Sequence, residues 1–68
     1  MQTCVKDFLV FIIEMSAERL FDNNKSSAYI ELKKAGILNY YAETFDVSHT
    51  LGSEYLLNEI KTLLNKNK

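Results

Sequence analysis

Apolar residues recur along this chain at helical spacing, and this periodicity restricts the fold more than any other feature of the sequence. The alternation typical of a half-buried strand is almost absent, and the chain contains no proline that would interrupt a helix. Its 68 residues leave room for one small domain. The sequence therefore predicts a single all-α domain over residues 1–68, built from four helices.

Turn and capping signals locate the four predicted helices. Thr3 is expected to cap the first helix, and the polar run "DNNKSS" separates the first two. Gly36 suits the left-handed position just past the end of the second helix. The predicted bounds are Thr3 or Cys4 to Phe21, Ser27 to Ala35, Leu38 to Phe45, and Leu51 or Ser53 to Asn65.

The first predicted helix carries apolar side chains over an unusually wide arc. This arc spans roughly 200°, about twice what one-sided burial needs, whereas the last helix has an ordinary core stripe. The first helix should therefore be central, contacted by several other helices or by a second subunit. The apolar positions are Val5, Phe8, Leu9, Val10, Ile12, Ile13, Ala17 and Leu20 in the first helix, and Leu56, Leu57, Ile60, Leu63 and Leu64 in the last.

Small size implies a thin margin of stability. A domain of about 60 residues buries only about 60% of the surface that its unfolded chain exposes. Burial of apolar area then nearly cancels the conformational entropy lost on folding. A second subunit would bury further apolar surface, so we expect self-association, with a homodimer as its simplest form.

Charge and the length of the apolar runs argue against two classes of partner, nucleic acids and membranes. The formal net charge of −1 creates no field that would gather phosphates. The segment "LNYYAETFD", which would be the recognition helix of a helix-turn-helix, has two acids and no Lys or Arg, so nucleic-acid binding is not expected. The longest apolar run, Phe8 to Ile13, is too short for a membrane-spanning helix or a signal peptide, so no membrane association is expected either.

The cysteine content indicates a compartment. Cys4 is the only cysteine and cannot form an internal disulfide. A reducing cytoplasm is therefore the expected location.

Several side chains fall outside the core arcs and are candidates for contact with another protein. Phe11 projects from an acidic strip of the first helix. This strip is either a solvated face partly neutralised by Arg19 and Lys25 or a surface for a basic partner. Tyr40 and Tyr55 also lie off the core arcs, as does Ile30. Tyr41 lies on the inner face of its helix with Leu38 and Phe45, so it should point away from Tyr40. The strip consists of Asp7, Glu14, Glu18 and Asp22.

The stretch "FDVSHTLGSEYLLNEI" holds the only histidine, together with groups that could carry chemistry. Asp46, His49 and Glu54, with Cys4, could supply metal ligands, but one histidine and two carboxylates near a turn form a weak pattern. A Cys4 nucleophile with His49 as base and Asp46 as orienter lacks a deep cleft and an evident oxyanion loop. A triad of Asp46, Ser48 and His49 is less favoured still, because a relay needs side chains that converge from separate elements. We therefore expect no enzyme activity, no resident metal and no cofactor.

A structural interpretation of the same stretch is simpler. Asp46 and Ser48 would form a turn, and Thr50 or Ser53 would cap the last helix. His49 would be partly buried, with its ring bonded to a backbone carbonyl or to Asp46.

Three segments of the chain resemble a family of short bacterial proteins of unknown function. The family pattern has an "FxxFxIE" segment, then "LLKxxGxLxY", then "YDxLHTxGxEYLVxDI". Phe45 and Ser48 depart from it, since they stand where the family has a tyrosine and an apolar residue. Members are often encoded near ADP-ribosyltransferase-like toxins, so the resemblance implies a regulator or antitoxin-like partner. The matching positions are Phe8, Phe11, Ile13, Glu14, Leu32, Lys33, Gly36, Leu38, Tyr40 or Tyr41, Asp46, His49, Thr50, Gly52, Glu54, Tyr55, Leu56 and Ile60.

These observations predict a small cytoplasmic protein-interaction module with a toxin-like or regulatory partner. The predicted contact residues are Phe11, Tyr40, His49, Glu54 and Tyr55. The alternative hypothesis is a small metal- or ligand-binding protein that uses the region of Asp46, His49, Glu54 and Tyr55.

Overall fold

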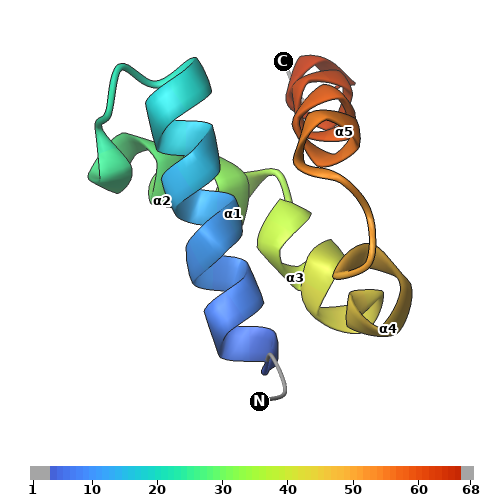
Figure 1. Ribbon diagram of the computed structural model, residues 1–68. Helices are drawn as coiled ribbons and strands as arrows, with labels where there is room; N and C mark the ends of the chain where they lie inside the picture. The colour runs from blue at the N-terminus through green and yellow to red at the C-terminus, as the bar shows by residue number, and fades with distance from the viewer. Residues whose placement is uncertain (1–3, 67–68) are drawn as a thin grey trace.

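The computed structural model describes residues 4–66 and confirms the predicted all-α domain (Figure 1). Five helices account for the secondary structure of these residues: α1 (Val5–Leu20), α2 (Lys25–Lys34), α3 (Ile37–Glu43), α4 (Phe45–Ser48) and α5 (Ser53–Lys66). Within the described part of the chain, no helix is long and apolar enough to cross a bilayer.

The beginnings of α1 and α2 show how capping residues set helix bounds. Cys4 occupies the cap position of α1 without a side-chain capping bond, and the predicted cap Thr3 lies outside the described residues. Asn24 caps α2, because its side-chain oxygen accepts a 3.0 Å hydrogen bond from the backbone N–H of Ser27. This cap starts α2 at Lys25, two residues before the predicted start.

Left-handed backbone conformations reverse the chain at both ends of α2. Asp22 and Asn23 have φ values of 53° and 66°, and the Asn23 N–H donates to the Ala17 carbonyl at 2.7 Å. Asn and Asp adopt this conformation more readily than other side chains. Gly36 has φ 75° between α2 and α3, as the sequence predicted.

The segment predicted as a turn before the last helix is instead the short helix α4. Thr44 separates α3 from α4, and its hydroxyl donates to the Tyr40 carbonyl at 2.9 Å. The Ser48 and Thr44 hydroxyls are 2.7 Å apart. Because the Thr44 proton is already used, Ser48 donates this bond. Ser48 is thus buried and bonded to a side chain, so its predicted role as a turn former is wrong.

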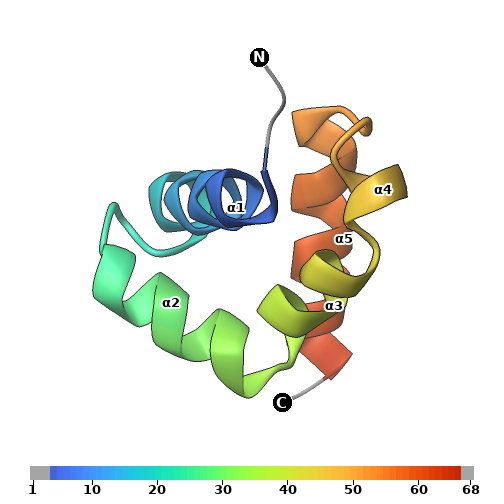
Figure 2. The same ribbon diagram turned by 90° about the horizontal axis from the view of Figure 1, so that it is seen from below.

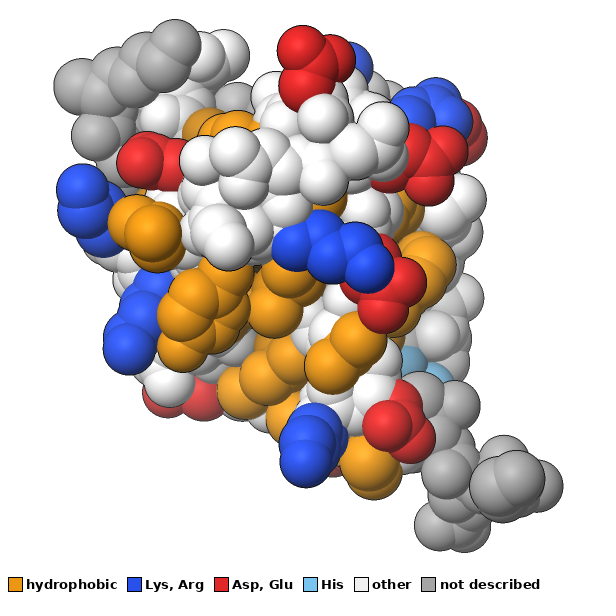
Figure 3. Space-filling view, turned by 90° about the vertical axis from the view of Figure 1, so that its left-hand side faces the viewer, with side chains coloured by type: hydrophobic (Ala, Val, Ile, Leu, Met, Phe, Trp, Pro, Cys, Tyr) orange, Lys and Arg blue, Asp and Glu red, His pale blue; other side chains and the backbone are white. Residues whose placement is uncertain are grey.

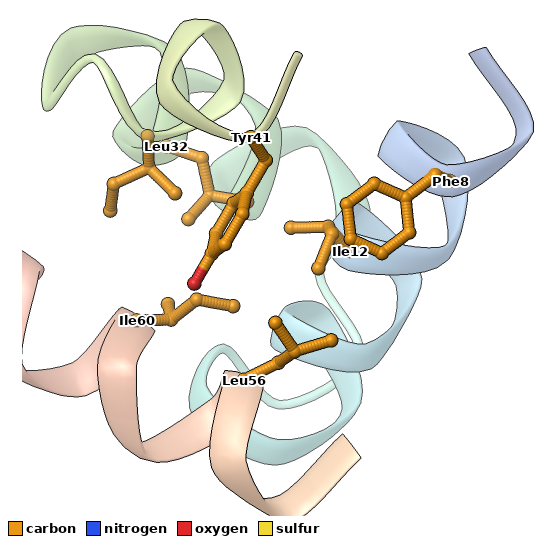
Figure 4. Packing of buried hydrophobic residues seen from close by; sticks show 7 residues of the cluster. Phe8, Ile12, Leu32, Tyr41, Leu56 and Ile60 are labelled. Carbon is orange, nitrogen blue, oxygen red and sulfur yellow. The ribbon is translucent and has the colours of Figure 1, made fainter. Parts of the chain in front are cut away.

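The core brings α1, α2, α3 and α5 together around one tyrosine (Figure 4). Tyr41 is fully buried, and its hydroxyl points towards α5, where it donates a 2.7 Å hydrogen bond to Oε1 of Glu59. The Phe8 ring meets the Tyr41 ring edge-on, with centroids 6.0 Å apart. The buried cluster consists of Phe8, Ile12, Leu32, Ile37, Tyr41, Leu56 and Ile60.

α1 is the central helix, as its wide apolar arc predicted. It contacts α2, α3 and α5. Figure 2 shows these three helices following one another round one side of α1. The other side of α1 has no neighbouring helix among the described residues, and this uncovered side borders the candidate site.

Candidate functional site

The α1–α3 groove is an apolar hollow of about 690 Å³ between α1, α2 and α3. Figure 3 shows hydrophobic side chains gathered on the face that includes α1 and α2, with acidic and basic side chains around them. Only two charged residues, Lys6 and Lys33, are among those lining the groove. Its lining consists of Val5, Lys6, Leu9, Val10, Ile13, Tyr29, Lys33, Leu38, Asn39 and Ala42.

Several large apolar side chains of this groove open to solvent. Val5, Val10 and Tyr29 are 37%, 43% and 44% exposed. Lys33 Nζ lies 5.7 Å from the centroid of the Tyr29 ring, which is within cation–π distance. Single exposed apolar residues are ordinary, but several that share one hollow mark a contact surface.

Two of the predicted contact residues line a second, smaller hollow of about 310 Å³ between α1 and the start of α5. Phe11 is 44% exposed there, and its ring stacks on Phe8 with centroids 6.4 Å apart. Glu54 accepts a 3.2 Å hydrogen bond from Arg19, so Arg19 pairs with α5 rather than neutralising the acidic strip. Glu14 and Glu18 of that strip line the same hollow.

Two further predicted residues, Tyr40 and Tyr55, lie close enough to interact electrostatically with each other. They are 40% and 56% exposed, as expected from their off-core positions. The negative charge of Glu59 raises the pKa of Tyr40, and partial burial adds to the shift. Burial raises the pKa of Tyr41 still more strongly, followed by its hydrogen bond to Glu59. The Tyr40 and Tyr41 rings contact edge-on at 5.1 Å, although one is exposed and the other buried.

His49 follows α4 and is held by two contacts with Phe45. Its Nδ1 lies 2.5 Å from the Phe45 carbonyl oxygen, and the two rings stack with centroids 4.5 Å apart. A carbonyl only accepts, so Nδ1 carries the proton. The predicted bond to a backbone carbonyl is confirmed, but His49 is exposed rather than partly buried. The helical path of α4 accounts for the difference, because it stacks the exposed His49 ring on the partly buried Phe45 ring.

A family model for proteins of unknown function, DUF3791, matches residues 7–67, nearly the whole chain. The chain belongs to the DUF3791 family. Comparison of this DUF3791 chain with curated proteins and with solved structures finds no match. The family-level resemblance is thus confirmed, whereas the detailed motif and the neighbouring toxin genes stay predictions.

The residues weighed as metal ligands form no metal-binding group in this DUF3791 domain. Within residues 4–66, no group of three or more His, Cys, Asp or Glu side chains could hold a metal ion. Asp46, His49 and Glu54 therefore form no such group, and neither do Cys4, Asp46 and His49. The Thr50 hydroxyl donates to the Val47 carbonyl at 2.6 Å, so it bonds back to α4 rather than capping α5.

Sequence reasoning did not identify the α1–α3 groove of this DUF3791 domain. It assigned Val5, Leu9 and Val10 to one wide apolar arc without showing which part of that arc other helices leave open. Tyr29 received no role. The available signal was the spacing of Tyr29 and Lys33, four residues apart on α2, which places a cation over an exposed ring.

Proposed function

We propose that this chain is a small, non-enzymatic protein-interaction module that associates with itself and with a larger toxin-like or regulatory protein. The observation that carries the proposal is the α1–α3 groove, where side chains from three helices expose apolar surface in one hollow. A small domain gains most from covering such a surface, because its own core is limited.

The nature of the second partner rests on the resemblance described above. Family members encoded near ADP-ribosyltransferase-like toxins support a toxin-like protein as the partner. The lone, exposed Cys4 supports the cytoplasm as the compartment in which the module acts.

No specific observation favours the alternative, a metal- or ligand-binding protein. Glu54 is engaged with Arg19, and the protonated Nδ1 of His49 bonds to the Phe45 carbonyl. Asp46 and Tyr55 are both exposed.

Light scattering coupled to size-exclusion chromatography tests self-association. The apparent mass should rise from that of a 7.9 kDa monomer towards twice that value as the concentration increases from low to high micromolar. A strictly monomeric protein across this range would contradict the self-association part of the proposal.

Single substitutions test the sequence-predicted contact residues. Phe11→Ala and Tyr55→Ala remove exposed rings from the surfaces of α1 and α5, so their folds should remain intact by circular dichroism. Loss of association in either variant assigns that face to a contact. Unchanged association in both would remove Phe11 and Tyr55 from the contact surface and leave the α1–α3 groove.

A further inference from the structure

We propose that the α1–α3 groove is covered by a second copy of this chain, in a two-fold dimer whose α1 helices lie antiparallel and cross at Val10. In this dimer, Lys6 of each copy pairs with Glu14 of the other. The inference rests on the proposed function, since it names the partner and geometry of the self-association proposed above.

An exposed ridge on α1, formed by Lys6, Val10 and Glu14, begins at one edge of the groove. Lys6 and Val10 line the groove itself, whereas Glu14 continues the row into the smaller hollow between α1 and α5. These residues are spaced four apart, so their side chains lie in one row along the helix. All three are exposed, and Val10 is 43% exposed. A helix that packs here meets an apolar centre with a charge one turn away on either side.

The order of charges on this ridge selects an antiparallel copy. Lys6 precedes Val10 by one turn and Glu14 follows it by one turn, about 6 Å along the axis in each direction. A two-fold axis at Val10 therefore sets Lys6 opposite Glu14 at both ends, as an isologous interface requires. Parallel pairing would instead set Lys6 against Lys6 and Glu14 against Glu14.

Both charges are available for such pairing. Among residues 4–66, neither Lys6 nor Glu14 takes part in an ion pair within the chain. Asp7 is an exposed acid next to Lys6 on α1. It also takes part in no ion pair among residues 4–66.

Charges of both signs along the groove edge favour a second copy over an entirely acidic or entirely basic partner helix. An acidic helix would complement Lys6 and Lys33 but would be repelled by Glu14. A basic helix would have the reverse problem. A copy of the same ridge complements both signs at once.

Apolar surface lies beside the ridge and would be covered by the same contact. Val5, Leu9 and Ile13 line the groove on α1, and Tyr29 and Leu38 line it from α2 and α3. α1 is 16 residues long, about 24 Å at ~1.5 Å per residue, and a helix is about 10 Å wide, so a contact along α1 alone covers on the order of 240 Å². This is well below the ~800 Å² per partner of a standard interface. We therefore expect a weak dimer that dissociates on dilution.

Charge reversal tests the pairing directly. Lys6→Glu or Glu14→Lys alone converts two attractive contacts per dimer into two repulsive ones and should raise the dimer dissociation constant roughly three- to tenfold at low salt. The double variant Lys6→Glu with Glu14→Lys restores unlike charges and should return the constant close to the original value. Sedimentation equilibrium measures all four proteins.

A matched control separates this contact from a general effect of charge. Lys61→Glu changes the net charge as Lys6→Glu does, but Lys61 is exposed on α5, away from the α1–α3 groove. It should leave the dissociation constant within about twofold of the original. Val10→Asp should weaken the dimer further than either reversal, and the surface charge variants remain informative if Val10→Asp disturbs folding.

The outcomes distinguish this inference from the proposed function. Dimerisation that is insensitive to both single reversals, or that the double variant fails to restore, overturns the antiparallel α1 contact while self-association stands. A wild-type chain that remains monomeric at high micromolar concentration overturns both.

Discussion

The hydroxyl of Tyr41 donates a 2.7 Å hydrogen bond to Oε1 of Glu59 and thereby joins α3 to α5 inside the domain. Tyr41 is fully buried, and Glu59 is half-buried. A bond of this kind gives the last helix a defined position, because apolar contacts at Leu56 and Ile60 have no preferred direction of their own.

Tyr41→Phe should destabilise the domain by about 1.5–3 kcal/mol, since it removes a hydrogen bond to a charged group and leaves the half-buried Glu59 without its donor. Urea denaturation measures the loss. Tyr29→Phe is the matched control, because Tyr29 is exposed and its ring remains available to Lys33. Equal effects at both positions would contradict a special role for the Tyr41 hydroxyl.

Alkaline pH should weaken the fold. Burial and the bond to Glu59 raise the pKa of Tyr41 above the value of about 10 that an unfolded tyrosine has. Above that pH the unfolded chain releases this proton while the folded chain keeps it, so stability falls by up to about 1.4 kcal/mol per pH unit. Urea denaturation from pH 9 upwards measures the slope. Tyr41→Phe should make the slope shallower, and an unchanged slope would contradict the assignment.

The two glycines should respond differently to alanine. Gly36→Ala places a Cβ on a residue with φ 75° and should cost about 1 kcal/mol, although nothing lies within 4 Å to clash with it. Gly52 also has open space and has no left-handed φ, so Gly52→Ala should be neutral or stabilising by up to about 1 kcal/mol. Thermal melting of the pair separates backbone strain from crowding. A larger loss at Gly52 would reverse the interpretation.

Ser16 offers a route to a more stable domain. Its hydroxyl is fully buried in α1 without a hydrogen-bond partner among the described residues. Ser16→Ala removes the unsatisfied group and introduces a better helix former, so the free energy of unfolding should rise by about 1 kcal/mol. Ser26→Ala, on the exposed side of α2, should change it by less than about 0.5 kcal/mol. Destabilisation by Ser16→Ala would indicate that the hydroxyl is satisfied in solution.

His49 should behave as a structural residue. His49→Ala removes the bond to the Phe45 carbonyl and the stacked ring contact, and a loss of about 1 kcal/mol is expected for such an exposed residue. Added Zn²⁺ should leave the melting temperature of the wild-type chain unchanged. A rise in melting temperature with Zn²⁺ that disappears in His49→Ala would instead support the metal-binding alternative.

Helix positions and the core stripe of α5 could be predicted because both depend on local periodicity. Leu56, Leu57 and Ile60 are buried as their spacing indicated. α4 could not be predicted in the same way, because four residues contain barely one helical turn. Asp46 and Ser48 favour turns by their local hydrogen bonding, and only the tertiary contact with Thr44 buries Ser48.

The candidate site was less accessible to sequence reasoning than the fold. A helical wheel shows which faces are apolar, but coverage of a face depends on where other helices pack. The exposure of Phe11, Tyr40 and Tyr55 was predicted correctly, since each lies off its core arc. The opening between α1, α2 and α3 depends on the angle set at Gly36, which periodicity does not specify.

The short connections between the helices also bear on how fast the chain reaches its working form. Four residues, 21–24, join α1 to α2, and two residues, 35–36, join α2 to α3. Short loops cost little entropy to close, so helical domains with local contacts commonly fold on the order of microseconds to milliseconds. A domain with this architecture is therefore expected to be folded before it meets any partner, without waiting for a slow folding step.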